Sequence, residues 1–227
     1  MRSHDALDQL APGGVDIHRH WEAYATIVRG GFYVEAAIEG RLEIDPHTLV
    51  LHPQFHLHSN IVAEAGAVWN VAISVAMVPN TNWFGSWRAF KGAAIDRLAA
   101  SENPPRAQDV LDAIERAEEM EFEPLPPWLK DIARLDSADF ARAQKQVSRE
   151  HAHRTFKRHF GMAPGRYRRE RQLQQAIRLF GSGHALADAA AEAGFTDQSH
   201  MTRVMTREFG VTPARFREQI TPVQEAG

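Results

Sequence analysis

The sequence predicts an α+β protein of more than one domain: a small N-terminal β-barrel with flanking helices, followed by an all-α domain of two similar helical units joined by a long helix. Three observations lead to this expectation. Short alternating apolar segments fill residues 15–78, helical periodicity fills residues 128–220, and a proline-rich stretch lies between the two. A chain of 227 residues has room for two modest domains.

The first half is dominated by strand signals. Alternating apolar runs separated by Gly, Pro and Asp turn residues occur at 24–28, 32–37, 48–51 and 68–74. We therefore expect a barrel over about 15–78, after a poorly ordered lead-in over 1–14. Helices are expected over about 89–120, which completes a first domain of residues 1–122.

The second of these helices, predicted over 107–120, has one apolar stripe on an otherwise acidic surface. The stripe consists of Val110, Leu111, Ile114 and Ala117. It needs a partner, which is either the barrel or a second subunit, so a homodimer through helix 107–120 is one expectation. The Glu-Pro-Leu-Pro-Pro stretch at 123–127 follows and predicts a stiff linker.

Beyond the linker the sequence predicts only helices, within a second domain of residues 128–220 and a tail over 221–227. Gly181-Ser182-Gly183 ends the longest of them. The predicted ranges are 128–135, 137–146, 148–160, 164–180, 186–193, 197–209 and 213–220.

Composition excludes several classes of site and points to one kind of partner. Cysteine is absent, which excludes disulfides, thiolate metal sites and cysteine nucleophiles. Neither a signal-peptide pattern nor an apolar run of about 18 residues occurs, so we expect a cytoplasmic protein without a membrane partner. Residues 1–127 hold 9 Lys and Arg against 18 Asp and Glu, a net −9, whereas residues 128–220 hold 17 against 10, a net +7. The basic half is the one expected to meet phosphate.

The basic half contains an internal repeat. Shifting it by 49 residues aligns Arg154 with Arg203, Phe160-Gly161 with Phe209-Gly210 and Tyr167-Arg168 with Phe216-Arg217. Two copies joined by one long helix predict a pair of helix-turn-helix units rather than a solenoid.

Helical spacing separates a buried from an exposed face in each unit. Met201, Val204, Met205 and Phe209 are expected to lie in the core of the second unit, as are Ala152, Thr155, Phe156 and Phe160 in the first. Asp197 and Ser148 are the expected N-caps. The opposite faces carry arginine, glutamine and carboxylate side chains, which are the groups that recognise base edges in the major groove. The predicted DNA-contacting residues are Arg149, Glu150, His153, Arg154 and Lys157 in the first unit, and Gln198, Ser199, His200, Thr202, Arg203 and Arg207 in the second.

The second unit resembles the signature of AraC-type transcription regulators. The matching residues run from Ala190 through Gly194-Phe195, Ser199-His200 and Arg203 to the stretch Phe209-Gly-Val-Thr-Pro213 and Phe216-Arg217. The first unit has Lys145-Gln146 where the second has Gly194-Phe195. The resemblance covers about 128–220 and implies two helix-turn-helix units that enter neighbouring major grooves of an operator.

The same resemblance implies positions and partners. It places Glu150, His153 and Arg154 at base-reading positions of the first unit, and Gln198, Ser199, His200 and Arg203 at those of the second. A double-stranded DNA operator, a small-molecule effector and RNA polymerase are the expected partners. An adaptor that contacts RNA polymerase with little affinity for DNA is another interpretation.

Histidines concentrate in the acidic half, where seven of twelve lie within residues 1–58. His18, His20 and Glu22 alternate on one predicted strand, and His56 and His58 alternate on another, so each set is expected to share a face. His47 and His52 are expected at the surface. The barrel resembles the small cupin domain at the N-terminus of many AraC-type regulators, with Glu39-Gly40 and Pro46 similar to a cupin turn.

Three interpretations of these histidines stay open. A metal-free effector pocket formed by His18, His20, Glu22, His56 and His58 is favoured, because the resemblance implies an organic effector and no cofactor. A metal site would use His18, His20, His56 and His58. The third is a purely structural role.

Catalysis has no further support in the sequence, since neither a Ser/His/Asp arrangement nor a glycine-rich phosphate loop is found. We therefore expect a transcription regulator and not an enzyme. The alternative is a metal-dependent cupin enzyme with a helical appendage. A stoichiometric metal that is lost in a His18→Ala/His20→Ala variant would favour that alternative.

Overall fold

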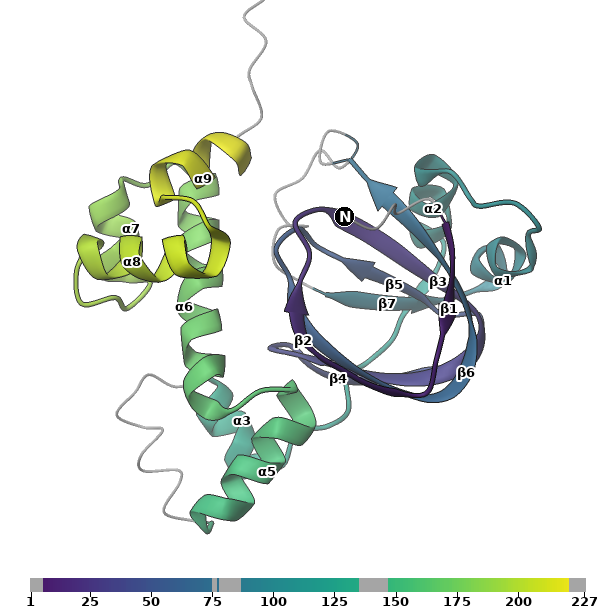
Figure 1. Ribbon diagram of the computed structural model, residues 1–227, viewed down its shortest axis with the longest axis horizontal. Helices are drawn as coiled ribbons and strands as arrows, with labels where there is room; N and C mark the ends of the chain where they lie inside the picture. The colour runs from purple at the N-terminus through teal and green to yellow at the C-terminus, as the bar shows by residue number, and fades with distance from the viewer. Residues whose placement is uncertain (1–5, 75–76, 78–86, 135–146, 221–227) are drawn as a thin grey trace, which may run out of the picture. The chain divides into compact units, whose positions relative to one another are not determined.

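A computed structural model describes residues 6–74, 77, 87–134 and 147–220. An antiparallel sheet fills most of the first half and helices fill the second (Figure 1), which confirms the predicted α+β class. By their contacts the residues divide into two compact units, one that ends at Pro164 and one that continues from Gly165. In the described part of the chain, no helix combines the length and apolar character that a membrane span requires.

The sheet is organised by its two longest strands, β3 and β6, which pair with each other along most of their length. Their N- and C-terminal halves have different outer neighbours, because β4 and β2 flank one half of the pair whereas β5 and β1 flank the other. The sheet therefore folds into two facing layers. The strands are β1 (Ala6–Leu10), β2 (Gly13–Arg19), β3 (Ala23–Ala37), β4 (Gly40–Ile44), β5 (Leu49–His52), β6 (Leu57–Ile73), β7 (Arg88–Lys91) and β8 (Glu118–Glu119).

Glycines allow the bend between the two layers. The register of β3 against β6 shifts around Gly30 and Gly31, and Gly31 has φ +88°, in the region that favours glycine. On β6, a Cβ at Gly66 would lie 1.9 Å from the Gly30 carbonyl oxygen. Any larger residue at position 66 would push the two strands apart where they cross.

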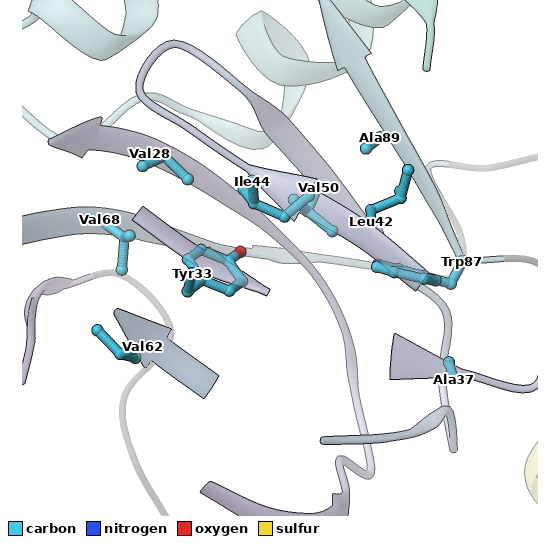
Figure 2. Close-up of a cluster of buried hydrophobic side chains, with 10 residues drawn as sticks. All are labelled: Val28, Tyr33, Ala37, Leu42, Ile44, Val50, Val62, Val68, Trp87 and Ala89. Atoms are coloured by element: carbon cyan, nitrogen blue, oxygen red, sulfur yellow. The ribbon is translucent and has the colours of Figure 1, made fainter. Parts of the chain in front are cut away.

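The core lies between the layers and draws from both (Figure 2). Val28, Val50 and Val68 come from one layer, and Tyr33 and Leu42 come from the other. Trp87, which directly precedes β7, is fully buried in the same cluster. Burial of these side chains holds the bent sheet closed.

Three predictions for the first half were wrong. Residues 6–10, expected in a disordered lead-in, form β1 and pair with residues 66–70 of β6. The segments 24–28 and 32–37 are parts of one strand, β3. The helices expected over 89–120 are shorter, because β7 precedes the first and β8 follows the second, and β7 and β8 pair with each other.

The apolar stripe on the second helix packs within the chain. Of the four predicted stripe residues, Val110 is buried and Leu111, Ile114 and Ala117 are half-buried, and the helix contacts both β6 and the preceding helix. The stripe is therefore covered in part by its own chain, and a homodimer through this helix stays a prediction.

The helices after the linker begin and end within about two residues of their predicted positions. The predicted helix 137–146, with Lys145-Gln146, and the tail 221–227 lie outside the described residues. The predicted domain boundary at 123–127 stays a prediction, although the Glu123 N–H donates to the Arg41 carbonyl at the edge of the sheet (2.9 Å). The helices are α1 (Ala93–Ala100), α2 (Ala107–Ile114), α3 (Pro127–Arg134), α5 (Arg149–Phe160), α6 (Pro164–Gly181), α7 (Leu186–Glu192), α8 (Gln198–Phe209) and α9 (Pro213–Ile220).

Candidate nucleic-acid interface and barrel cavity

Two hydrogen bonds fix the start of helix α8: one in the turn that precedes it and one at its N-cap. Gly194 has φ +78°, and its carbonyl accepts a hydrogen bond from Gln172 Nε2 of α6 (2.7 Å). Phe195 is buried directly after this turn. The Asp197 carboxylate accepts from the His200 backbone N–H (2.6 Å), which confirms the predicted N-cap.

The two faces of α8 separate as the sequence predicts. The four predicted core residues are buried. Gln198, Ser199, Arg203 and Arg207 are exposed, whereas His200 and Thr202 are half-buried. The helix therefore presents a polar face that starts at its N-terminus, which is the end that contacts bases in helix-turn-helix proteins.

Two members of this face already have local contacts. The Thr202 hydroxyl donates to the Gln198 carbonyl (2.9 Å), and the His200 ring packs edge-on against Phe195 at 5.6 Å between centroids. Within the described residues, Arg203 makes no ion pair or side-chain hydrogen bond. Arg203 is thus the cation on α8 most available to a ligand.

Helix α5, like α8, has a side-chain N-cap and ends at a left-handed glycine. The Ser148 hydroxyl caps it by accepting from the His151 N–H (3.2 Å), and Gly161 ends it with φ +66°. Three of the predicted core residues are buried, and Thr155 is half-buried. Glu150, His153, Arg154 and Lys157 are exposed, and Arg149 is the first residue of the helix, although its side chain lies outside the described part.

The described arginines of α5 are paired with carboxylates, as Arg207 of α8 is with Glu208 (3.2 Å), so the two helices differ at Arg154 and the equivalent Arg203. Arg154 pairs with Glu150 one turn earlier. Arg158 pairs with Glu123 (3.0 Å), and Glu123 also binds Arg41. Two carboxylates therefore compete with any phosphate or base for the guanidinium groups of α5.

A second candidate site is a cavity of about 450 Å³ inside the sheet unit. His18 of β2 lies directly opposite His58 of β6 in the strand register, and their rings are 4.4 Å apart. His20 follows β2, with its ring 4.9 Å from His18 and 5.4 Å from His58. Other polar side chains that line the cavity include Tyr24, Glu35, His52, Asn60 and Asn70.

Burial controls protonation in this cavity. Burial raises the pKa of Glu35 to about 8, and the nearby His56 and His18 lower it only in part. Burial, and then the neighbouring histidines, hold the pKa of His58 well below its ordinary value. The imidazole of His58 is therefore neutral at physiological pH, as a metal ligand or a hydrogen-bond acceptor must be.

The structure brings together only some of the predicted barrel residues. His18, His20 and His58 line the cavity. Glu22 is exposed and is not among the lining residues, and His56 is buried with its Nε2 3.1 Å from Glu39. His47 is exposed, as predicted, and lies 3.1 Å from Asp96.

The prediction that His52 lies at the surface was wrong. His52 is 2% exposed, and its Nε2 lies 2.8 Å from Glu35 Oε1. Sequence reasoning also missed Glu35 and Tyr24. The pairing register of β3 and β5 would have revealed Tyr24, because it places Tyr24 opposite His52. The sequence of a single strand does not contain this register.

Comparison with known proteins gives one family match. A family model described as a helix-turn-helix domain matches residues 143–219. No curated protein sequence matches the chain. Among solved structures, the chain is similar to ToxT from Vibrio cholerae O395, with 11% identity over 96% of this chain and 97% of that chain and a TM-score of 0.43. It is also similar to unsaturated-fatty-acid-bound ToxT from Vibrio cholerae strain SCE256, with 11% identity over 100% of both chains and a TM-score of 0.41.

The matched range begins before α5 and ends in α9, so it includes both capped helices and the long helix α6. Residues 143–219 therefore match a helix-turn-helix domain, in the same range in which the repeated signature resembles that of AraC-type regulators.

Proposed function

We propose that the protein is a sequence-specific DNA-binding transcription regulator of AraC type, in which α5 and α8 read two adjacent segments of one operator. The single observation that carries this proposal is the family match over 143–219. The exposed polar faces of both helices and the net charge of +7 over 128–220 support it.

The roles of individual residues are part of the proposal. Arg203, Gln198 and Ser199 have exposed side chains near the start of α8, where side chains reach base edges. Lys157 is exposed on α5 and is proposed to contact phosphate. His153 and His200 are proposed to occupy further base-reading positions of α5 and α8, and Arg207 lies one turn after Arg203 on α8.

The test is a selection of bound DNA by the purified full-length chain from a random pool, followed by gel shifts at fixed salt. We expect one enriched sequence that binds at least about 10³-fold more tightly than scrambled DNA. A final pool without enrichment, together with equal binding of all duplexes, would leave a non-specific basic protein. No salt-dependent shift at all would favour the adaptor that contacts RNA polymerase.

Control by a small molecule is the second part of the proposal. A cavity of about 450 Å³ is within the ordinary size range of small-molecule sites, and polar groups converge in it. The effector is proposed to bind among His18, His20 and His58 and to change the affinity of the chain for its operator. A homodimer and contact with RNA polymerase remain further predictions, which sedimentation and co-purification would test.

The rival function is a metal-dependent cupin enzyme, which the histidine cluster favours. We propose that the chain is not an enzyme, because the family model that matches it describes a helix-turn-helix domain. A metal ion bound in the barrel is compatible with both functions. Selection of bound DNA distinguishes them, because an enzyme without a DNA site would enrich no sequence.

A further inference from the structure

The imidazole cluster in the barrel has the composition of a metal site. One ligand atom each from His18, His20 and His58 lies within 4.8 Å of the others. Three imidazoles bound to one zinc ion at about 2.0–2.1 Å would place their ring centroids about 5 Å apart. The observed separations of 4.4, 4.9 and 5.4 Å bracket that value, so small side-chain rotations would bring the three rings onto one ion.

A buried nitrogen gives independent support. His58 is 1% exposed, and within the described residues its Nδ1 has no hydrogen-bond partner. A buried polar atom left without a partner costs free energy comparable to a lost hydrogen bond, and an ion bound to this nitrogen would remove that cost. The other nitrogen of His58 lies 3.5 Å from the Tyr24 hydroxyl, a contact suited to holding the ring in place.

A second group of possible ligands also contains His58 but is less suited to bind a metal ion. Glu35, His52 and His58 also have one ligand atom each within 4.8 Å. Glu35 and His52 are already joined by a 2.8 Å hydrogen bond and are almost fully buried, whereas His18 and His20 are only half-buried and thus reachable from solvent. The set with His18 and His20 is therefore the better candidate.

We propose that the barrel binds one divalent transition-metal ion through the imidazoles of His18, His20 and His58. Imidazole ligands suit zinc, copper, iron and nickel more than magnesium or calcium. Three protein ligands leave a coordination position open, and here it would face the 450 Å³ cavity. This deepens the proposed function, because an oxygen or nitrogen atom of the effector could bind the ion at that position.

The carboxylate in the cavity wall is Glu35, and not Glu22, which the sequence places beside the histidines. Glu22 follows His20 closely in the chain but is exposed and is not among the lining residues, whereas Glu35 of β3 lies in the cavity wall. We expect Glu35 to stay bonded to His52 beside the ion and to support His58 from that side.

The experiment is a cobalt and zinc titration of the full-length chain, purified without a histidine tag and treated with a chelator. Cobalt(II) absorption reports the number and type of ligands, and a chromophoric chelator reports zinc affinity. We expect one equivalent of metal with the visible absorption of four- or five-coordinate cobalt. His18→Ala and His58→Ala should each weaken binding by at least about 100-fold, because even hydrogen-bond partners of metal ligands contribute about 10–100-fold.

His47→Asn is the matched control. It removes an exposed histidine of the same unit, and asparagine tolerates the left-handed backbone at this position, φ 64°. We expect the control to bind one equivalent with unchanged affinity. Circular dichroism of each variant establishes that the sheet has formed before its affinity is compared.

Three results would overturn the proposal. The first is a wild-type chain that binds no more cobalt than folded His58→Ala. The second is a folded His18→Ala variant with unchanged affinity. The third is a Glu35→Gln variant that loses binding while His18→Ala retains it, which would assign the ion to the deeper set. A chain that binds one cobalt ion but enriches no DNA would support the metal site and refute the regulator, so the two failures are distinguishable.

Discussion

The two proposed reading helices are close copies that differ in the ion pairing of one equivalent arginine. Helices α5 and α8 each have twelve residues, a side-chain N-cap and a left-handed glycine at the C-terminal end. On α5, the exposed arginine Arg154 is paired with Glu150, whereas the equivalent Arg203 on α8 has no such partner within the described residues.

Under the proposed function, this difference predicts that the two helices contribute unequally to DNA recognition. An arginine that must first break an ion pair with a carboxylate contributes less binding free energy at a base than an unpaired arginine does. The shared caps and core positions keep both helices formed. We therefore expect α8 to dominate specificity and α5 to contribute mainly position and charge.

The largest expected effect is the loss of specificity in Arg203→Ala. Loss of a bidentate base contact should cost about 1–3 kcal/mol on the selected operator and relax the preference at one base pair. Affinity for scrambled DNA should change little, as measured by gel shifts at one salt concentration. Arg215→Ala, which removes an exposed charge from α9, is the control and should lower both affinities alike. Equal losses on both DNAs in Arg203→Ala would refute its role as a base reader.

The next effect separates the two N-caps. Asp197→Ala and Ser148→Ala should each destabilise their helix by about 1 kcal/mol. The loss should be larger for Asp197, because its hydrogen bond is shorter (2.6 against 3.2 Å) and its charge also interacts with the helix dipole. Amide hydrogen exchange in the first turn of each helix measures the difference, with Asp197→Asn as the conservative control. Faster exchange after Ser148→Ala than after Asp197→Ala would show that the Ser148 cap stabilises its helix more than the Asp197 cap does, which contradicts the prediction.

The helices could be predicted closely because their determinants are local. Ser148, Asp197, Gly161 and Gly210 act within one turn of the helix that they begin or end, so their positions in the sequence are sufficient. The 49-residue repeat then provided a second copy of each signal.

The sheet was harder to predict because its determinants are distant. The short segment 6–10 becomes a strand only because β6 is there to pair with it, and Asp8 accepts a hydrogen bond from Asn70, 62 residues away (2.8 Å). Likewise, Glu35 lies in the half of β3 that pairs with β4, whereas His52 lies on β5, so the two meet only because the sheet folds over on itself. The sequence therefore indicated a histidine-rich barrel but not which of its polar residues share one cavity.

A smaller effect is expected from the Glu150–Arg154 pair. An exposed pair one turn apart on a helix contributes about 0.3–0.5 kcal/mol, and this must be given up before Arg154 binds DNA. Arg154→Ala should therefore reduce specific affinity by less than Arg203→Ala, and Glu150→Gln should raise affinity for all duplexes. The double variant Glu150→Gln/Arg154→Ala measures the coupling between the two residues. A specificity loss in Arg154→Ala as large as that in Arg203→Ala would show that both helices read bases equally.

The smallest effect is expected at the position where α5 has Lys157 and α8 has Thr206, 49 residues later. Both side chains are exposed, but only lysine can displace a counterion from phosphate. Lys157→Ala should weaken every duplex alike and reduce the slope of log affinity against log salt by about 1. Thr206→Lys should increase that slope by a similar amount if α8 lies equally close to the backbone. A Lys157→Ala variant that changes the ranking of DNA sequences would place this lysine on a base instead, and α5 would then contribute to specificity through a residue other than its paired arginine.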